Sequence, residues 1–271
     1  MSLASSNFAS SSGDGYELQM GRWSRKLSGP FLDFAGVNTS GRILDAGCGT
    51  GALAVELLQR TEMAEIVGID ISDAYVAHAK SAIGDQRATF ETGDLTALHF
   101  ADGTFDQVFS QLVLQFVPNS VGAIGELVRV TRPGGSVAAA VWDLRGGLIF
   151  NRLFLDTAAM LDPAADALRS LNFTRYLTRP DELAEAWRAA GLVDRKAGEV
   201  TIRTDFSSFE DYWKPFDGKD GPIPAYLRKA APEMRQRVKD AVRRAYLDGE
   251  EDGRRSYAAT TWVVVGRKQS D

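Results

Sequence analysis

The chain has 271 residues but only one cysteine and two histidines. A single cysteine, Cys48, cannot form a disulfide within the chain, so nothing indicates an oxidising compartment. A membrane helix needs about 18 or more mostly apolar residues, and no run in the sequence approaches that length. Asp and Glu outnumber Lys and Arg, 36 to 31, which argues against general nucleic-acid or anionic-membrane binding. We therefore expect a cytoplasmic protein with no nucleic-acid or membrane partner.

Metal-site and targeting patterns are also missing. No cluster of His, Asp or Glu has the spacing of metal ligands, so we expect no metal, and His78 and His99 are expected to be structural. The Ser-rich N-terminus lacks the basic start and apolar core of a secretory signal. Residues 1–15 are therefore expected to be a disordered leader, and residues 16–271 a single domain.

The most informative stretch of the sequence is Ile43–Gly51, ILDAGCGTG. Its apolar start reads as a strand, and glycines at alternate positions, Gly47, Gly49 and Gly51, read as a tight loop that leads into a helix. Glycine lets the backbone approach a ligand closely and adopt a positive φ. The start of the following helix offers unpaired N–H groups to a polar or anionic ligand. This pattern predicts a loop that binds a nucleotide-type cofactor.

Three carboxylates indicate what kind of cofactor this is. A dinucleotide loop would read G-x-G-x-x-G, whereas this one reads G-x-G-x-G and is preceded by Asp45, which would repel a pyrophosphate but attract an ammonium group. Asp70 ends the apolar run AEIVGID and can accept two hydrogen bonds from a ribose diol. Asp94 follows another short strand and can accept a hydrogen bond from an adenine amine. Such a set suits a ligand that carries an amino acid, a ribose and an adenine.

The order of these motifs resembles the class I S-adenosylmethionine (SAM)-dependent methyltransferases. The most similar subgroup is the small-molecule methyltransferases related to the enzymes of ubiquinone and menaquinone biosynthesis, and the resemblance is close over about residues 40–145. The matching segments are D-A-G-C-G-T-G at 45–51, G-I-D at 68–70, G-D-L at 93–95, D-G-T-F-D at 102–106 and R-V-T-R-P-G-G at 129–135.

The resemblance implies a set of residues that bind SAM and its product S-adenosylhomocysteine. The glycines would line the methionine part, Asp70 would hold the ribose, and Gln111 would lie near the sulfonium. Cys48 is expected to be small where a bulkier side chain would collide with the cofactor. The full set after the first strand is Asp45, Ala46, Gly47, Cys48, Gly49 and Gly51, followed by Asp70 and Ile71, then Gly93, Asp94 and Leu95, then Ser110 and Gln111.

The segment 16–27 is a further candidate, because related enzymes fold such a segment over the cofactor. Tyr16 is expected to help close the pocket. Two interpretations of Arg22 remain open. In the first, Arg22 pairs with the SAM carboxylate. In the second, it points to water while Trp23 and Leu27 pack the helix on the sheet.

The alternation of apolar runs and helical patterns predicts an α/β fold. We expect a doubly wound, seven-stranded, mostly parallel Rossmann-like sheet with helical cap insertions at 146–178 and 205–253, and the family implies a final two-stranded hairpin. Ligands bind beyond the carboxyl ends of such strands, where the candidate residues would meet. The expected strands are 42–45, 65–70, 88–92, 105–110, 136–142, 193–203 and 257–267, and the expected helices are 52–61, 73–83, 121–131, 180–190 and one from Pro232.

The leading functional hypothesis is metal-independent, in-line transfer of a methyl group from SAM to a small-molecule acceptor. The alternatives are a SAM-binding regulator or partner subunit without transfer activity, and an RNA or protein methyltransferase. The segment SQLVLQF stands where amine methyltransferases acting on DNA bases or glutamine carry N-P-P-Y, which argues against that device. No catalytic base is assigned, and both a monomer and a homodimer are compatible with the sequence.

Overall fold

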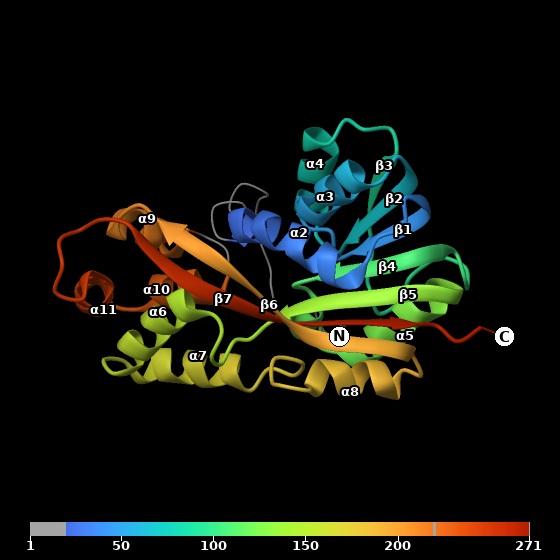
Figure 1. Cartoon of the computed structure of the whole chain (residues 1–271). Helices are drawn as coiled ribbons and strands as arrows, with labels where there is room; N and C mark the ends of the chain where they lie inside the picture. Colours follow the sequence, from blue (N-terminus) through green and yellow to red (C-terminus); the bar gives the residue numbers. More distant parts are fainter. Residues whose placement is uncertain (1–19, 219–220, 271) are drawn as a thin grey trace.

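The computed structural model describes residues 20–218 and 221–270, so the expected leader and Tyr16 lie outside the described residues. A seven-stranded sheet in the order β3-β2-β1-β4-β5-β7-β6 runs through the molecule (Figure 1). The first five strands are parallel, and β7 is antiparallel to both β5 and β6, which confirms the expected sheet and its final hairpin. The strands are β1 (Ser40–Ala46), β2 (Met63–Asp70), β3 (Ala88–Thr92), β4 (Phe105–Gln111), β5 (Thr131–Trp142), β6 (Val193–Phe206) and β7 (Arg255–Arg267).

Helices cover both faces of the sheet. Neighbouring residues of a strand point to opposite faces, so Ile43 and Leu44 of β1 are both fully buried but belong to different hydrophobic cores. The core around Ile43 includes α2, α3 and α4, and the core around Leu44 includes α5 and α8. These helices are α2 (Arg22–Ala35), α3 (Ala52–Arg60), α4 (Asp73–Ala82), α5 (Ser120–Val130) and α8 (Glu182–Ala189).

Local signals place most helix ends where they were expected. The Ser72 hydroxyl accepts a hydrogen bond from the Tyr75 backbone N–H and caps α4. Two expectations were wrong. The strand expected at 136–142 is longer, because β5 already begins at Thr131 and continues through Pro133-Gly134-Gly135. Pro180 does not lie in the first turn of α8, because Asp181 has a left-handed φ of 67° and the helix begins only at Glu182.

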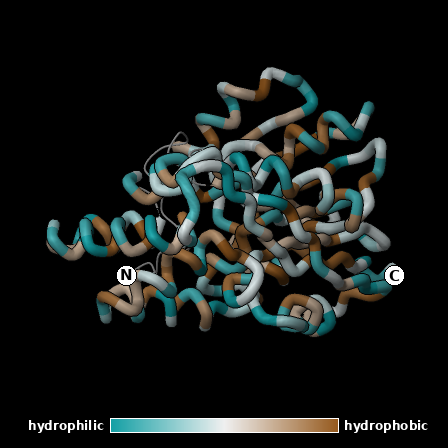
Figure 2. Tube along the Cα trace, turned by 60° about the vertical axis from the view of Figure 1, so that its left-hand side comes forward, coloured by the Kyte–Doolittle hydropathy of each residue, from teal (hydrophilic) through white to brown (hydrophobic). Residues whose placement is uncertain are grey.

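The remaining helices form a cap at the end of the molecule where β6 and β7 extend beyond the other strands (Figure 1). Apolar residues concentrate in the interior and polar residues on the outer helices (Figure 2). Within the described ranges, no helix has the length and apolar character needed to cross a membrane. The cap consists of α6 (Ile149–Ala159), α7 (Pro163–Phe173), α9 (Phe209–Trp213), η3 (Lys214–Asp217), α10 (Pro222–Lys229) and α11 (Pro232–Leu247).

Candidate functional site

The glycine loop lies between β1 and α3 and is tied to the neighbouring strand. The backbone N–H groups of Gly47 and Cys48 both donate to the carbonyl oxygen of Ile69, at 2.7 and 3.0 Å. Gly47 has a φ of +81°, and a Cβ at this position would lie 2.3 Å from Cγ2 of Val113. Both the conformation and the space therefore require glycine, and the bare backbone faces the cavity described below.

Asp70 connects this loop to the start of α4. Its carboxylate accepts hydrogen bonds from the backbone N–H groups of Gly49, at 3.0 Å, and Ser72, at 2.9 Å. Burial raises the pKa of Asp70, and these two hydrogen bonds act against that rise. The two contacts fix the direction of the carboxylate at the carboxyl end of β2.

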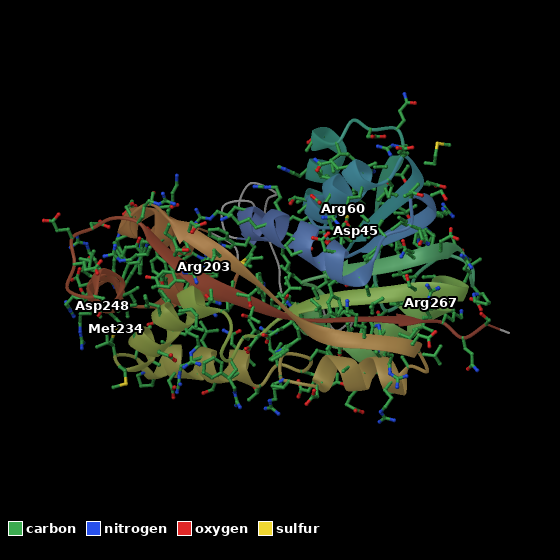
Figure 3. All side chains as sticks on the ribbon, viewed as in Figure 1. Asp45, Arg60, Arg203, Met234, Asp248 and Arg267 are labelled. Carbon is green, nitrogen blue, oxygen red and sulfur yellow. The ribbon has the colours of Figure 1, made fainter. Side chains whose placement is uncertain are left out.

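Asp45 is buried behind the loop, with 1% of its surface exposed. It lies in the α/β part of the molecule, at the other end from Met234 and Asp248 of the cap (Figure 3). Its Oδ2 atom has no hydrogen-bond partner among the described residues. Burial, together with the nearby charge of Asp70, raises the pKa of Asp45 to about 7. A buried carboxylate oxygen without a partner is uncommon, and a cation bound at the loop would favour the ionised form of Asp45.

A single cavity joins the ends of the parallel strands to the cap. Its sheet side carries most of the polar groups, and its cap side is mainly aromatic and aliphatic. The sheet side is lined by Met20, Gly47, Gly49, Asp70, Ile71, Ser72, Tyr75, Asp94, Leu95 and Gln111, and the cap side by Leu112, Val113, Phe116, Val117, Trp142, Leu144, Leu148, Phe150, Asn151, Asn172, Phe216, Pro222 and Ile223.

The cavity brings together seven of the residues singled out in the sequence, which are Gly47, Gly49, Asp70, Ile71, Asp94, Leu95 and Gln111. The other candidates within the described residues do not line it. Several of these support the loop instead: the Ser110 hydroxyl donates to the carbonyl oxygen of Ala46 at 3.0 Å, and a Cβ at Gly93 would lie 2.4 Å from Ile69. The candidates outside the lining are Arg22, Asp45, Ala46, Cys48, Gly51, Gly93 and Ser110, and their contact with the cofactor stays a prediction.

Arg22 pairs with a carboxylate of the protein itself. Its guanidinium contacts Asp211 of the cap, with Nη1 and Oδ1 2.9 Å apart, and stacks over the rings of Trp23 and Phe206. Its pairing with the SAM carboxylate stays a prediction. Trp23 and Leu27 are buried, as the packing interpretation of this helix expects.

The end of β4 forms the floor of the cavity next to α2. The side-chain amide nitrogen of Gln111 donates to Ser24 O, at 3.1 Å, and to Ser28 Oγ, at 3.2 Å, while its Oε1 is buried without a partner among the described residues. The next residue, Leu112, has a φ of +64°, which is strained for a leucine. Such strain at a cavity wall is typical of functional sites.

Sequence reasoning missed most of the cap-side lining. Trp142 ends β5, so the rule about carboxyl ends of strands would have identified it. Val113 and Phe116 belong to SQLVLQF, which was noted only for the motif it lacks; in the structure this segment includes the short helix η2 (Leu114–Phe116). Phe150 and Ile223 come from the cap, where no local signal distinguishes a lining residue from a core residue.

Within residues 20–218 and 221–270, no three His, Cys, Asp or Glu side chains are grouped as a metal site requires. Metal independence stays a prediction.

The family model and the relatives that this chain matches are described as methyltransferases. Residues 44–139 match the family model described as a methyltransferase domain. A demethylmenaquinone methyltransferase of Beutenbergia cavernae is 31% identical over 185 residues, which are 63% of this chain and 75% of the relative. A malonyl-[acyl-carrier protein] O-methyltransferase of Erwinia pyrifoliae is 35% identical over 209 residues, which are 70% of this chain and 78% of the relative.

Solved structures agree on the fold. A putative methyltransferase of Bacillus halodurans superposes with a TM-score of 0.59 at 16% identity and covers 90% of this chain and 99% of its own. A phosphoethanolamine N-methyltransferase of Haemonchus contortus, solved in complex with SAM, superposes with a TM-score of 0.60 at 18% identity and covers 95% of this chain and 57% of its own.

Proposed function

Because the chain belongs to the class I SAM-dependent methyltransferases, we propose that it methylates a small, largely apolar acceptor bound beneath the cap. One observation carries this proposal. The same cavity is lined by the glycine loop and the strand-end carboxylates on one side and by apolar cap residues such as Phe150, Phe216 and Ile223 on the other. The cap would thus offer an apolar surface to the acceptor opposite the cofactor.

The residues on the sheet side fit SAM. The backbone at Gly47 and Gly49 is open to the methionine part, and the fixed carboxylate of Asp70 can accept hydrogen bonds from the ribose. Asp94 is held by the backbone N–H and the hydroxyl of Thr96, each at 2.8 Å, and its fixed carboxylate in the cavity lining would accept a hydrogen bond from the adenine amine. Ionised Asp45 would stabilise the positively charged cofactor through the loop.

SAM supplies a methyl group on a sulfonium, which is reactive enough for a single in-line displacement. The protein then has to align the acceptor with this methyl group and exclude water. The titratable residues of the lining, Asp70, Tyr75 and Asp94, belong to the sheet side. Among the described residues, the cap side of the lining carries no general base, so we expect an acceptor atom that needs none: one that is acidic, already ionised or part of a carbon–carbon double bond. The relatives, whose names include a demethylmenaquinone methyltransferase and a sterol 24-C-methyltransferase, support an apolar acceptor.

The proposal is tested by calorimetric titration with SAM, followed by transfer of a labelled methyl group to a panel of quinones, sterols and alkyl carboxylates. Asp70→Asn should lower SAM affinity at least about ten-fold, whereas Asp85→Asn, at a half-buried Asp85–Arg87 pair outside the cavity, should leave it unchanged.

A variant on the cap side tests methyl transfer separately from SAM binding. Ile223→Trp should retain SAM binding but lose methyl transfer, because Ile223 lines only the cap side. Label transferred to RNA or protein, and to none of the small molecules, would contradict the proposed acceptor class.

A further inference from the structure

Arg175 is a half-buried cation beside the cap side of the cavity. It lies in the connection between α7 and α8, and its Nε reaches Asn172 Oδ1 only at a long 3.4 Å. Its guanidinium stacks over the ring of Phe116, 5.2 Å from the ring centre. Among the described residues no carboxylate pairs with it, and its two terminal nitrogens have no hydrogen-bond partner.

This environment differs from that of four arginines that lie beside carboxylates. Carboxylate partners raise the pKa values of Arg60, Arg87, Arg129 and Arg169. For Arg175, burial alone lowers the pKa. A desolvated charge without a counterion is costly, so an anion bound beside Arg175 would be stabilised.

The connection that carries Arg175 is firmly anchored. Leu177 is fully buried with a left-handed φ of 72°, which is strained for a leucine. The Thr178 hydroxyl donates to the Arg175 carbonyl oxygen at 2.8 Å, and the Trp262 indole N–H of β7 donates to the Thr178 carbonyl oxygen at 3.1 Å. The turn therefore holds Arg175 against the sheet.

We propose that Arg175, together with the side-chain amide of Asn172, binds a carboxylate group of the acceptor at the rim of the cavity. Arg175 is itself outside the lining of the cavity, but it contacts two residues that line it, Asn172 and Phe116, so its guanidinium lies next to the rim. A guanidinium can donate two parallel hydrogen bonds to a carboxylate. One cation offsets one negative charge, so a monoanionic carboxylate fits better than a phosphate dianion.

The inference rests on the proposed function and narrows its substrate class. The apolar cap side would receive the body of the acceptor, and Arg175 would orient it by one end. The acceptor would then be a carboxylate with an apolar body, and its anionic group would fix which atom faces the methyl donor.

The test uses the protein loaded with S-adenosylhomocysteine and two probes of equal chain length, decanoate and decanol. Calorimetric titration of the wild type should show decanoate binding at least about ten-fold tighter than decanol. Arg175→Gln should abolish this preference and leave the affinity for S-adenosylhomocysteine unchanged. The control is Arg188→Gln, since Arg188 is exposed on α8 and pairs with Glu185; it should keep the preference.

Equal binding of the two probes by the wild type would overturn the carboxylate site, as would a preference that survives in Arg175→Gln. Tighter binding of decyl phosphate than of decanoate would overturn the choice of carboxylate. If Arg175→Gln does not fold, Arg175→Lys replaces it. Lysine keeps the charge but not the two-pronged geometry, so an unchanged preference in this variant would also count against the site. Failure of the wild type to bind S-adenosylhomocysteine would instead overturn the proposed function.

Discussion

Asp45 and Asp70 are buried carboxylates at the ends of neighbouring strands, but they have different surroundings. Asp70 accepts two backbone hydrogen bonds, whereas Asp45 retains an oxygen without a partner among the described residues. The two charges repel each other, and this repulsion adds to the effect of burial on Asp45. A cationic cofactor would relieve both effects, which links the protonation of this pair to cofactor binding.

The stability of the cofactor-free protein should therefore fall as pH rises. The pKa of Asp45 is about 7 in the folded state and 3.8 in the reference state, so between these values the folded chain holds a proton that the unfolded chain has lost. Stability decreases with pH wherever the folded state binds more protons. Urea unfolding at pH 5, 6, 7 and 8 should show this decline, and Asp45→Asn should make it shallower. An equal slope in both proteins would remove Asp45 as its cause.

Gly47 is the second residue on which the site depends. Gly47→Ala should lower SAM affinity by about ten-fold or more and lower the melting temperature, because the new Cβ would lie 2.3 Å from Val113 and the residue has a φ of +81°. Calorimetry and thermal unfolding measure the two effects. Gly84→Ala is the matched control, since a Cβ at Gly84 meets no atom within 4 Å; a similar loss in both variants would argue against a specific role of the loop.

Among the elements, α2 connects the sheet to the cap. On one side of the helix, the side chain of Gln111 in β4 forms hydrogen bonds with Ser24 and Ser28. On the other side Arg22 pairs with Asp211, and the Arg22 guanidinium stacks on aromatic rings of α2 and β6. The position of the helix therefore depends on polar contacts as well as on packing.

Asp211→Ala should destabilise the protein by about 1–3 kcal/mol, the usual cost of leaving a buried polar group unsatisfied. Nε and Nη2 of Arg22 are already buried without a partner among the described residues, so loss of Asp211 leaves the guanidinium without a counterion. Urea unfolding measures the change in the free energy of unfolding. Glu185→Gln, at the exposed Arg188 pair, should change it by less than about 0.5 kcal/mol. Equal effects would show that the Arg22 pair contributes no more than a surface pair.

On the scale of the whole molecule, cap and sheet share strands and a core. β6 and β7 run from the sheet into the cap (Figure 1). One hydrophobic cluster contains Ile43 and Phe109 of the sheet together with Phe154, Trp213 and Val238 of the cap. The cap is therefore built onto the same core as the cofactor site.

We expect sheet and cap to unfold in one cooperative transition. Far-UV circular dichroism and tryptophan fluorescence should give the same midpoint in urea, because Trp142 ends β5 and Trp213 lies in the cap, and both belong to the shared cluster. S-adenosylhomocysteine should shift both curves equally. Two separate midpoints would show that the cap unfolds independently.

Local sequence determined much of this protein. The alternation of apolar runs predicted the strands and most helices, because burial on both faces of a parallel sheet requires continuous apolar segments. The glycine spacing and the carboxylates Asp70 and Asp94 predicted the cofactor side, because each follows a strand and all parallel strands end at one edge. These features depend on residues that are only a few positions apart in the chain, so the sequence alone reveals them.

The tertiary structure alone decided the cap side. Arg22 meets Asp211, 189 residues away, and Arg175 reaches Phe116 across the junction of cap and sheet. Tyr246 is buried on α11, whereas its neighbour Ala245 is exposed. Long-range packing places the helices, and this placement decides which apolar side chains face a cavity and which fill a core. The periodicity of the sequence does not encode it.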